Sequence, residues 1–138
     1  MVLMKRILYI MAIIMLAVTS CKEQDPVKTP AELICGDWHS TMLAVEGDIY
    51  ASFASDGSFD LYQKIGEGAY RLYTGSWTMN GNVISGKYSD GSDWSSSYSV
   101  IFNDKFMTWT SQNDASEESQ YQRCPEIPAE VIENSHPQ

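Results

Sequence analysis

Between residues 35 and 124, apolar and polar positions alternate with a period of two, and turn-forming residues interrupt the alternation at short intervals. The dipeptides Asp56-Gly57 and Asn80-Gly81 indicate hairpin turns, because their residues tolerate the positive φ angles that such turns require. We find no helical stripe of apolar residues in this region. The pattern predicts eight strands, at residues 38–44, 49–53, 58–63, 70–79, 82–89, 94–102, 105–111 and 118–123.

Strands that follow one another through short turns are typical of an antiparallel meander. We therefore expect an all-β fold, in which an eight-stranded antiparallel up-and-down meander closes into a barrel. Closure is favoured because it removes the two unpaired edges of the sheet. An open sheet or a two-sheet sandwich is the alternative.

The inner face of this barrel is expected to be rich in aromatic side chains. A barrel of about eight strands is just wide enough to be filled by side chains or to hold one small ligand, and the pattern leaves both possibilities open. If a cavity exists, its walls offer apolar contact to a small apolar or amphipathic molecule. The expected ligand-binding residues are Trp38, Phe53, Phe59, Leu61, Tyr73, Trp77, Trp94 and Tyr98.

Other aromatic and apolar residues fall on mixed or outward faces of the predicted strands. An outward aromatic patch would favour a different function, a non-catalytic surface module that binds a protein or a glycan. The residues concerned are Tyr62, Tyr70, Tyr88 and either Phe106 or Met107.

The N-terminal segment has the features of a secretory signal peptide. Lys5 and Arg6 precede an unbroken apolar run over residues 7–18, and this run is shorter than the ~20 residues that a membrane-spanning helix needs. The following residues, Val18-Thr19-Ser20-Cys21, resemble the lipobox of bacterial lipoproteins. An ordinary cleavage site with an incidental cysteine is the alternative.

The lipobox resemblance implies that residues 1–20 are removed and that lipid is attached to Cys21. Residues 21–31 then form a polar lipidated tether, the barrel occupies 32–125, and 126–138 form a polar C-terminal tail in which 128–132 could make one helical turn. Lys22 stands where aspartate would favour retention in the inner membrane, so the resemblance implies a lipid anchor in the outer membrane, on its periplasmic or cell-surface face.

Two cysteines remain for the folded part. Cys35 opens the first predicted strand and Cys124 follows the last, and these strands are neighbours in a closed up-and-down barrel. Because an exported protein folds in an oxidising compartment, we expect a disulfide between them. Two buried free thiols are the alternative.

Three short motifs resemble those of lipocalins and of small secreted lipocalin-like lipoproteins. Gly36-Asp37-Trp38 is similar to the G-x-W signature of lipocalins, residues 53–59 to an F-x-x-D-G-x-F hairpin, and residues 73–82 to a Y-x-G-x-W strand followed by N-G-N. The resemblance implies a barrel or half-barrel, and often an apolar ligand.

Composition and charge narrow the remaining classes. The 138 residues suffice for one ordinary domain, expected to be monomeric, and the net charge of -9 argues against a nucleic-acid partner. The histidines, His39 and His136, are far apart in sequence, and alternation places His39 on the solvent face. We therefore expect no catalytic residues, no metal site, no cofactor and no enzymatic activity; Asp56, Asp90 and Asp104 are explained by turns.

Overall fold

The computed structural model of this chain describes residues 27–138. The predicted signal peptide, residues 1–20, and the predicted lipidation site, Cys21, lie outside the described residues.

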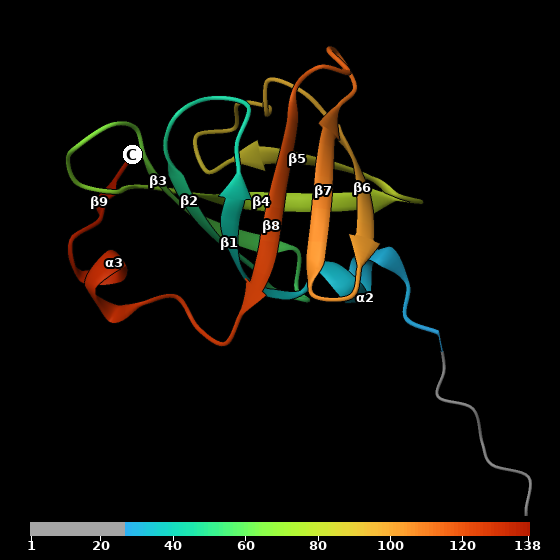
Figure 1. Cartoon of the computed structure of the whole chain (residues 1–138), viewed down its shortest axis with the longest axis horizontal. Coiled ribbons are helices and arrows are strands. Elements are labelled where there is room, and N and C mark those ends of the chain that lie inside the picture. The colour runs from blue at the N-terminus through green and yellow to red at the C-terminus, as the bar shows by residue number, and fades with distance from the viewer. Residues whose placement is uncertain (1–26) are drawn as a thin grey trace, which may run out of the picture.

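Eight strands follow one another and wind into a single closed sheet (Figure 1). A short helix, α2 (Pro30–Ile34), precedes the first strand, and a second short helix, α3 (Ala129–Glu133), and a two-residue strand, β9 (His136–Pro137), follow the last. The eight strands are β1 (Gly36–Met42), β2 (Asp48–Phe53), β3 (Ser58–Lys64), β4 (Arg71–Asn80), β5 (Val83–Tyr88), β6 (Tyr98–Asn103), β7 (Phe106–Ser111) and β8 (Glu118–Cys124).

The sheet closes because each of these strands pairs antiparallel with the strands before and after it. The first and last strands meet in the register Trp38↔Arg123, and β3 pairs with β4 over six residues of each strand. The pairing of β5 with β6 is the shortest of the eight, since only Val83 and Ile84 have partners there. These pairings confirm the predicted all-β fold, an eight-stranded antiparallel up-and-down meander closed into a barrel.

The sixth strand is shorter than predicted. The alternation indicated a strand from Trp94, but β6 begins at Tyr98 and residues 89–97 form a long loop. Serine hydroxyls in this loop bond across to neighbouring strands, with Ser97 Oγ 2.7 Å from Ser85 Oγ and Ser96 Oγ 2.7 Å from Ser111 Oγ. Side-chain hydroxyls of this kind compete with regular ladder pairing, which explains why the alternation of Trp94, Ser96 and Tyr98 does not continue the strand.

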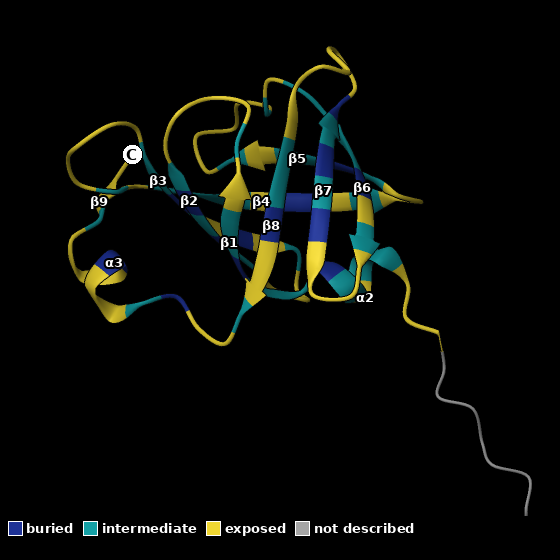
Figure 2. Ribbon diagram, in the orientation of Figure 1, coloured by how far each residue is buried: buried dark blue, intermediate teal, exposed yellow. Residues whose placement is uncertain are grey.

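The buried core lies inside the barrel, and Figure 2 shows buried positions along the strands and in α2. Trp38 and Ile84 are both 0% exposed, and Met107 is 1% exposed. Helix α2 lies over this end of the barrel and contributes Ile34, which is also fully buried. The half of the interior next to α2 is therefore packed with side chains.

The contacts between α2, β1 and β8 explain the Gly-x-Trp motif physically. The indole Nε1 of Trp38 donates to the carbonyl oxygen of Ile34 at 2.8 Å, and the guanidinium of Arg123 lies over the Trp38 ring at 4.2 Å from its centroid. Arg123 also donates to the carbonyl oxygens of Leu33 and Cys35. Gly36 has a φ of +124°, and a Cβ there would lie 2.5 Å from Arg123 Nη1, so glycine is required beside this arginine.

The C-terminal segment does not remain a solvated tail. Ile127 and Val131 are 8% and 4% exposed because they pack on the outer face of the barrel against Tyr62, together with Tyr50, Tyr70 and Leu72. Strand β9 adds a parallel pair to β4. The expected helical turn exists as α3, but it covers the side of the barrel formed by β2, β3 and β4.

The predicted disulfide is not present in the structure, where Cys35 and Cys124 are both free. The register pairs Cys124 with Asp37, so Cys35 is offset by two residues from the position opposite Cys124. Cys35 caps α2 and precedes β1, so it does not take part in the ladder that pairs β1 with β8. Cys35 Sγ instead lies 3.2 Å from the carbonyl oxygen of Ala31.

Over residues 27–138, none of the helices is long and apolar enough to cross a bilayer.

Candidate functional site

The barrel interior contains a cavity of about 360 Å³, and several residues of the core form part of its wall. Seven of its lining side chains are aromatic: Phe53, Phe59, Tyr88, Trp94, Tyr98, Trp109 and Tyr121. The other lining residues are the apolar Leu43, Ala44, Val45, Ile49 and Leu61 and the polar Gln63, Ser95, Glu117 and Ser119.

The cavity lies at the end of the barrel opposite α2. In an up-and-down meander the β1–β2, β5–β6 and β7–β8 connections share one end, and residues of these connections line the cavity. Helix α2 precedes β1 and therefore lies at the other end. Val45, in the β1–β2 loop, is 65% exposed and marks the rim. The cavity therefore has a mouth of loops and a floor of packed core residues.

The aromatic side chains form one continuous wall around Trp109. Its ring centroid lies 5.2 Å from that of Tyr98, 5.6 Å from that of Tyr121 and 6.0 Å from that of Trp94. The centroid of Phe59 lies 5.2 Å from that of Trp94, in an edge-to-face arrangement. Tilted and edge-to-face contacts are the favourable geometries for aromatic pairs, so this wall is held in place by its own packing.

Two tyrosines of the wall, Tyr88 and Tyr121, carry neutral hydroxyls. Burial, with smaller contributions from Tyr98 and Tyr73, raises the pKa of Tyr88. Burial also raises the pKa of Tyr121 far above its usual range. These hydroxyls can therefore donate and accept hydrogen bonds at neutral pH without carrying charge.

Trp94 lies in the long β5–β6 loop, and its ring reaches the cavity by packing against Gly86 of β5. A Cβ at Gly86 would lie well inside van der Waals distance of three carbons of the Trp94 ring. The backbone N–H of Trp94 donates to the carbonyl oxygen of Gly86 at 3.0 Å and holds the loop against the strand. The missing side chain of Gly86 thus provides the space that the indole occupies.

Five of the eight residues predicted to contact a ligand line this cavity: Phe53, Phe59, Leu61, Trp94 and Tyr98. The other three do not line it. Trp38 belongs to the packed half below, Trp77 is buried with its Nε1 donating to the carbonyl oxygen of Ser58 at 3.0 Å, and Tyr73 packs beside Tyr88 at a centroid distance of 5.7 Å.

The sequence prediction missed three aromatic members of the wall. Trp109 and Tyr121 lie in strands that were predicted, but no inner face was assigned to those strands. Met107 and Trp109 are two residues apart in β7 and face the same side, so an inward assignment of Met107 would also have identified Trp109 as inward. Tyr88 was expected on a mixed or outward face, and this expectation was wrong, because Tyr88 lines the cavity. Either Phe106 or Met107 was expected on such a face, and Phe106 is 37% exposed whereas Met107 is 1% exposed.

A polar cluster lies on the outer face of the barrel. The carboxylate of Asp48 accepts a hydrogen bond from the Tyr70 hydroxyl at 2.5 Å and lies 2.7 Å from His39 Nε2. The His39 ring is stacked on Tyr50 at a centroid distance of 4.0 Å. Partial burial raises the pKa of Asp48, but hydrogen bonds from Tyr70, His39 and Ser40 outweigh it, so the pKa is lowered overall. Asp48 thus joins His39 and Ser40 of β1 to Tyr70 at the end of the β3–β4 loop, which indicates a role in attaching these segments to one another.

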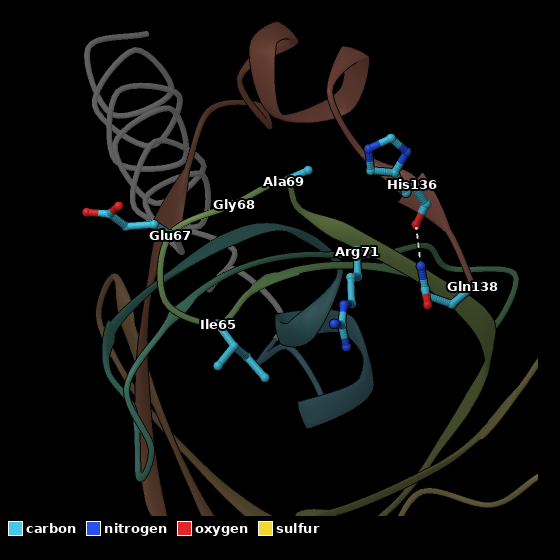
Figure 3. Close-up of a pocket in the computed structure, with 7 residues that line it drawn as sticks. All are labelled: Ile65, Glu67, Gly68, Ala69, Arg71, His136 and Gln138. Carbon is cyan, nitrogen blue, oxygen red and sulfur yellow. Dashed lines mark hydrogen bonds between the residues drawn. The ribbon is translucent and has the colours of Figure 1, made fainter.

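A second hollow of about 310 Å³ lies between the β3–β4 loop and the C-terminal residues (Figure 3). Glu67, Arg71 and His136 are among its lining residues, and all three are exposed. In Figure 3 the Glu67 side chain points away from Arg71, so these groups do not converge on a common point. The interior cavity, with its continuous wall, is the stronger candidate site.

Within the part of the chain that the structure describes, no group of three or more His, Cys, Asp or Glu residues is placed to hold a metal ion.

Comparison with known proteins adds information about the fold alone. No protein-family model matches the chain, and no curated protein matches it. A solved structure with a similar fold, the NMR structure of a protein from Bacteroides uniformis ATCC 8492, has a TM-score of 0.53 and 15% sequence identity. The match covers 74% of this chain and 96% of that chain. The chain therefore shares an eight-stranded barrel fold with a protein whose description names no ligand or activity.

Proposed function

We propose that this protein is a lipoprotein, anchored by lipid in the outer membrane, whose lipocalin-like barrel binds a small apolar or amphipathic molecule in the interior cavity. The aromatic-walled cavity of about 360 Å³ carries this proposal. Ligand pockets are typically ~300–1,000 Å³ in volume and are lined mainly by apolar and aromatic side chains with a few polar groups. Gln63, Ser95, Glu117 and Ser119 are the polar groups here.

The sequence supports the anchoring half of the proposal. Lys5 and Arg6, the apolar run over 7–18 and Cys21 have the order and spacing of a lipoprotein signal. Residues 27–29 lead into α2 at the closed end of the barrel. An anchor at Cys21 would therefore join the barrel at its closed end and leave the mouth of the cavity accessible.

Little in the structure favours the alternative, a surface module that binds a protein or glycan through exposed aromatic residues. Tyr62 and Tyr70, which were expected to face outward, pack with the C-terminal segment. Phe106 is the one aromatic residue among the exposed large apolar side chains of residues 27–138, and it is 37% exposed. The half-buried outer rings of Tyr50 and Tyr70 pack with His39, Lys64 and the C-terminal segment, and we therefore rank this alternative second.

Titration with phenylbutanol, an uncharged aromatic alcohol, tests the binding half. The full chain is placed in phosphatidylcholine vesicles, and the fluorescence of Trp94 and Trp109 reports occupancy of the cavity. We expect saturable quenching that Ser119→Phe abolishes, because Ser119 lines the cavity. Gln122→Phe, on the outer face of the same strand, is the control and should bind like the wild type. Equal binding by a folded Ser119→Phe variant would contradict the proposal.

Mass spectrometry of the N-terminal peptide tests the anchoring half. In protein extracted from membranes, we expect the first residue to be Cys21 carrying covalent lipid, and Cys21→Ser to lose that lipid. An unmodified cysteine, or cleavage at another position, would refute the anchor while leaving the cavity proposal intact.

A further inference from the structure

The loops around the mouth of the cavity carry charge of one sign. The three loops that line the cavity, residues 43–47, 89–97 and 112–117, contain five acidic residues and no lysine or arginine. The acidic residues are Glu46, Asp90, Asp93, Asp114 and Glu117. A mouth with low-dielectric walls and charge of one sign concentrates ions of the opposite sign and repels ions of the same sign.

Three of these five carboxylates have partners within the fold, whereas Glu46 and Glu117 have no side-chain partner among the described residues. Asp90 and Asp114 accept hydrogen bonds from the hydroxyls and backbone N–H groups of Ser92 and Ser116, and these bonds lower the pKa of both carboxyl groups. They are therefore ionised at neutral pH. Asp93 alone has a basic partner, Lys87 Nζ at 3.4 Å, and both side chains of this pair are exposed.

The wall of the cavity, like the loops around its mouth, carries negative charge and no positive charge. Glu117 is the one charged residue among the residues that line it. No lysine, arginine or histidine lines the cavity, so no group there could neutralise a carboxylate, sulfate or phosphate. Around the same space lie the rings of Trp94, Tyr98 and Trp109, whose negatively polarised faces attract organic cations.

From these observations, and resting on the proposed function, we infer that the ligand is a small organic cation with an apolar body, an amine or quaternary ammonium compound, and not a fatty acid or other anionic amphiphile. The apolar body occupies the aromatic cavity. The cationic group lies near Glu117 at the mouth, where the acidic loops attract it. A bound anion would lose its hydration against a wall that offers no opposite charge, which makes its entry unfavourable.

Three phenylalkyl probes of similar size and different charge test this inference. They are phenylbutyl-trimethylammonium, phenylbutanol and phenylbutanoate, each titrated into phosphatidylcholine vesicles that carry the full chain, with empty vesicles as the reference. Tryptophan fluorescence reports binding. We expect the cation to bind about tenfold tighter than the alcohol, the effect of a desolvated cation–π contact of ~1–2 kcal/mol. We expect the carboxylate to bind more weakly than the alcohol.

Two adjacent glutamates provide a matched pair of variants. Glu117→Gln removes the carboxylate that lines the cavity, whereas Glu118→Gln removes the same charge from the next residue, which does not line it. We expect Glu117→Gln to weaken binding of the cation about threefold, as for a partly exposed ion pair, and to leave phenylbutanol unchanged. Glu118→Gln should bind all three probes like the wild type.

The outcomes separate the inference from the function on which it rests. If none of the three probes binds, the proposed function fails and the inference fails with it. If phenylbutanol binds and phenylbutanoate binds as tightly as the cation, the cavity function stands and the charge inference is overturned. Equal losses for the cation and the alcohol in Glu117→Gln would show that Glu117 acts on the shape of the site and not through its charge.

Discussion

Arg123 should contribute strongly to stability although it is exposed, because it joins three elements at the closed end of the barrel. Its guanidinium donates to the carbonyl oxygens of Leu33 and Cys35, at 2.5 and 2.9 Å, and stacks on Trp38. With ~1 kcal/mol for each of the two hydrogen bonds and ~0.5–1 kcal/mol for an exposed cation–π contact, Arg123→Ala should lower the free energy of unfolding by about 2.5–3 kcal/mol. Arg123→Lys keeps the charge but loses the two-pronged geometry, and should lose about half as much.

Urea unfolding followed by tryptophan fluorescence measures these differences. Lys105→Ala, an exposed position in the β6–β7 turn, is the control and should change stability by less than ~0.5 kcal/mol. A loss in Arg123→Ala no larger than that of the control would refute the stacking and hydrogen-bonding argument.

A double-mutant cycle with Gly36→Ala tests the same contact independently. Alanine at this φ of +124° stores ~1–3 kcal/mol of backbone strain, and its Cβ would also displace the guanidinium, 2.5 Å away. In the Arg123→Ala background only the strain remains, so Gly36→Ala should cost ~1 kcal/mol less there than in the wild type. Equal costs in both backgrounds would show that Gly36 and Arg123 are not coupled.

Three further predictions concern other parts of the barrel. Because the pKa of Asp48 is lowered in the fold, its carboxylate stabilises the protein above about pH 4, and this stability is lost as the pH falls through the lowered value. Asp48→Asn should therefore be less stable than the wild type in urea at pH 7, and the difference in unfolding free energy should shrink at pH 3. A difference that stays constant between the two pH values would contradict this prediction. Gly86→Ala should force the Trp94 ring to move, because the added Cβ would overlap it. The substitution should lower the unfolding free energy by ~1–3 kcal/mol and shift the tryptophan emission. An unchanged emission spectrum would contradict the contact between Gly86 and Trp94. In urea unfolding, Val131→Ala should lower the unfolding free energy by ~1–2 kcal/mol because Val131 is buried. Ile132→Ala, at a position that is 48% exposed, should be nearly neutral. Equal effects of the two substitutions would mean that α3 does not pack as described.

The alternation of single residues predicted the barrel well because it is a local signal. Each strand alternates between an inner and an outer face, so residues such as Phe53 and Phe59 indicate both the strand and its inner side without reference to the rest of the chain. The turn residues Asp56 and Asn80 are local in the same way. Eight such segments in sequence, joined by short turns, leave closure as a favourable way to pair the edges.

The prediction was weaker where the environment of a residue depends on a distant segment. Gly86 interrupts the apolar pattern of β5, so the inward position of Tyr88 was not recognised. Ser111 is polar yet 3% exposed, because its hydroxyl meets that of Ser96 from the loop before β6. In both cases the partner that makes the inner position acceptable comes from another element of the fold.

The sequence by itself determined the number and order of the strands, the closed meander and most of the aromatic residues that face inward. It also contains the acidic loops and the N-terminal segment that resembles a lipoprotein signal, on which the two proposals depend. Only the tertiary structure decided how the interior is divided: α2, Trp38 and Arg123 pack one half, and Trp94 enters the other half from a loop above Gly86. Alternation specifies which side of a strand faces inward, whereas the space left between inward side chains depends on register and on loops distant in sequence, and this is why the cavity could not be derived from the pattern alone.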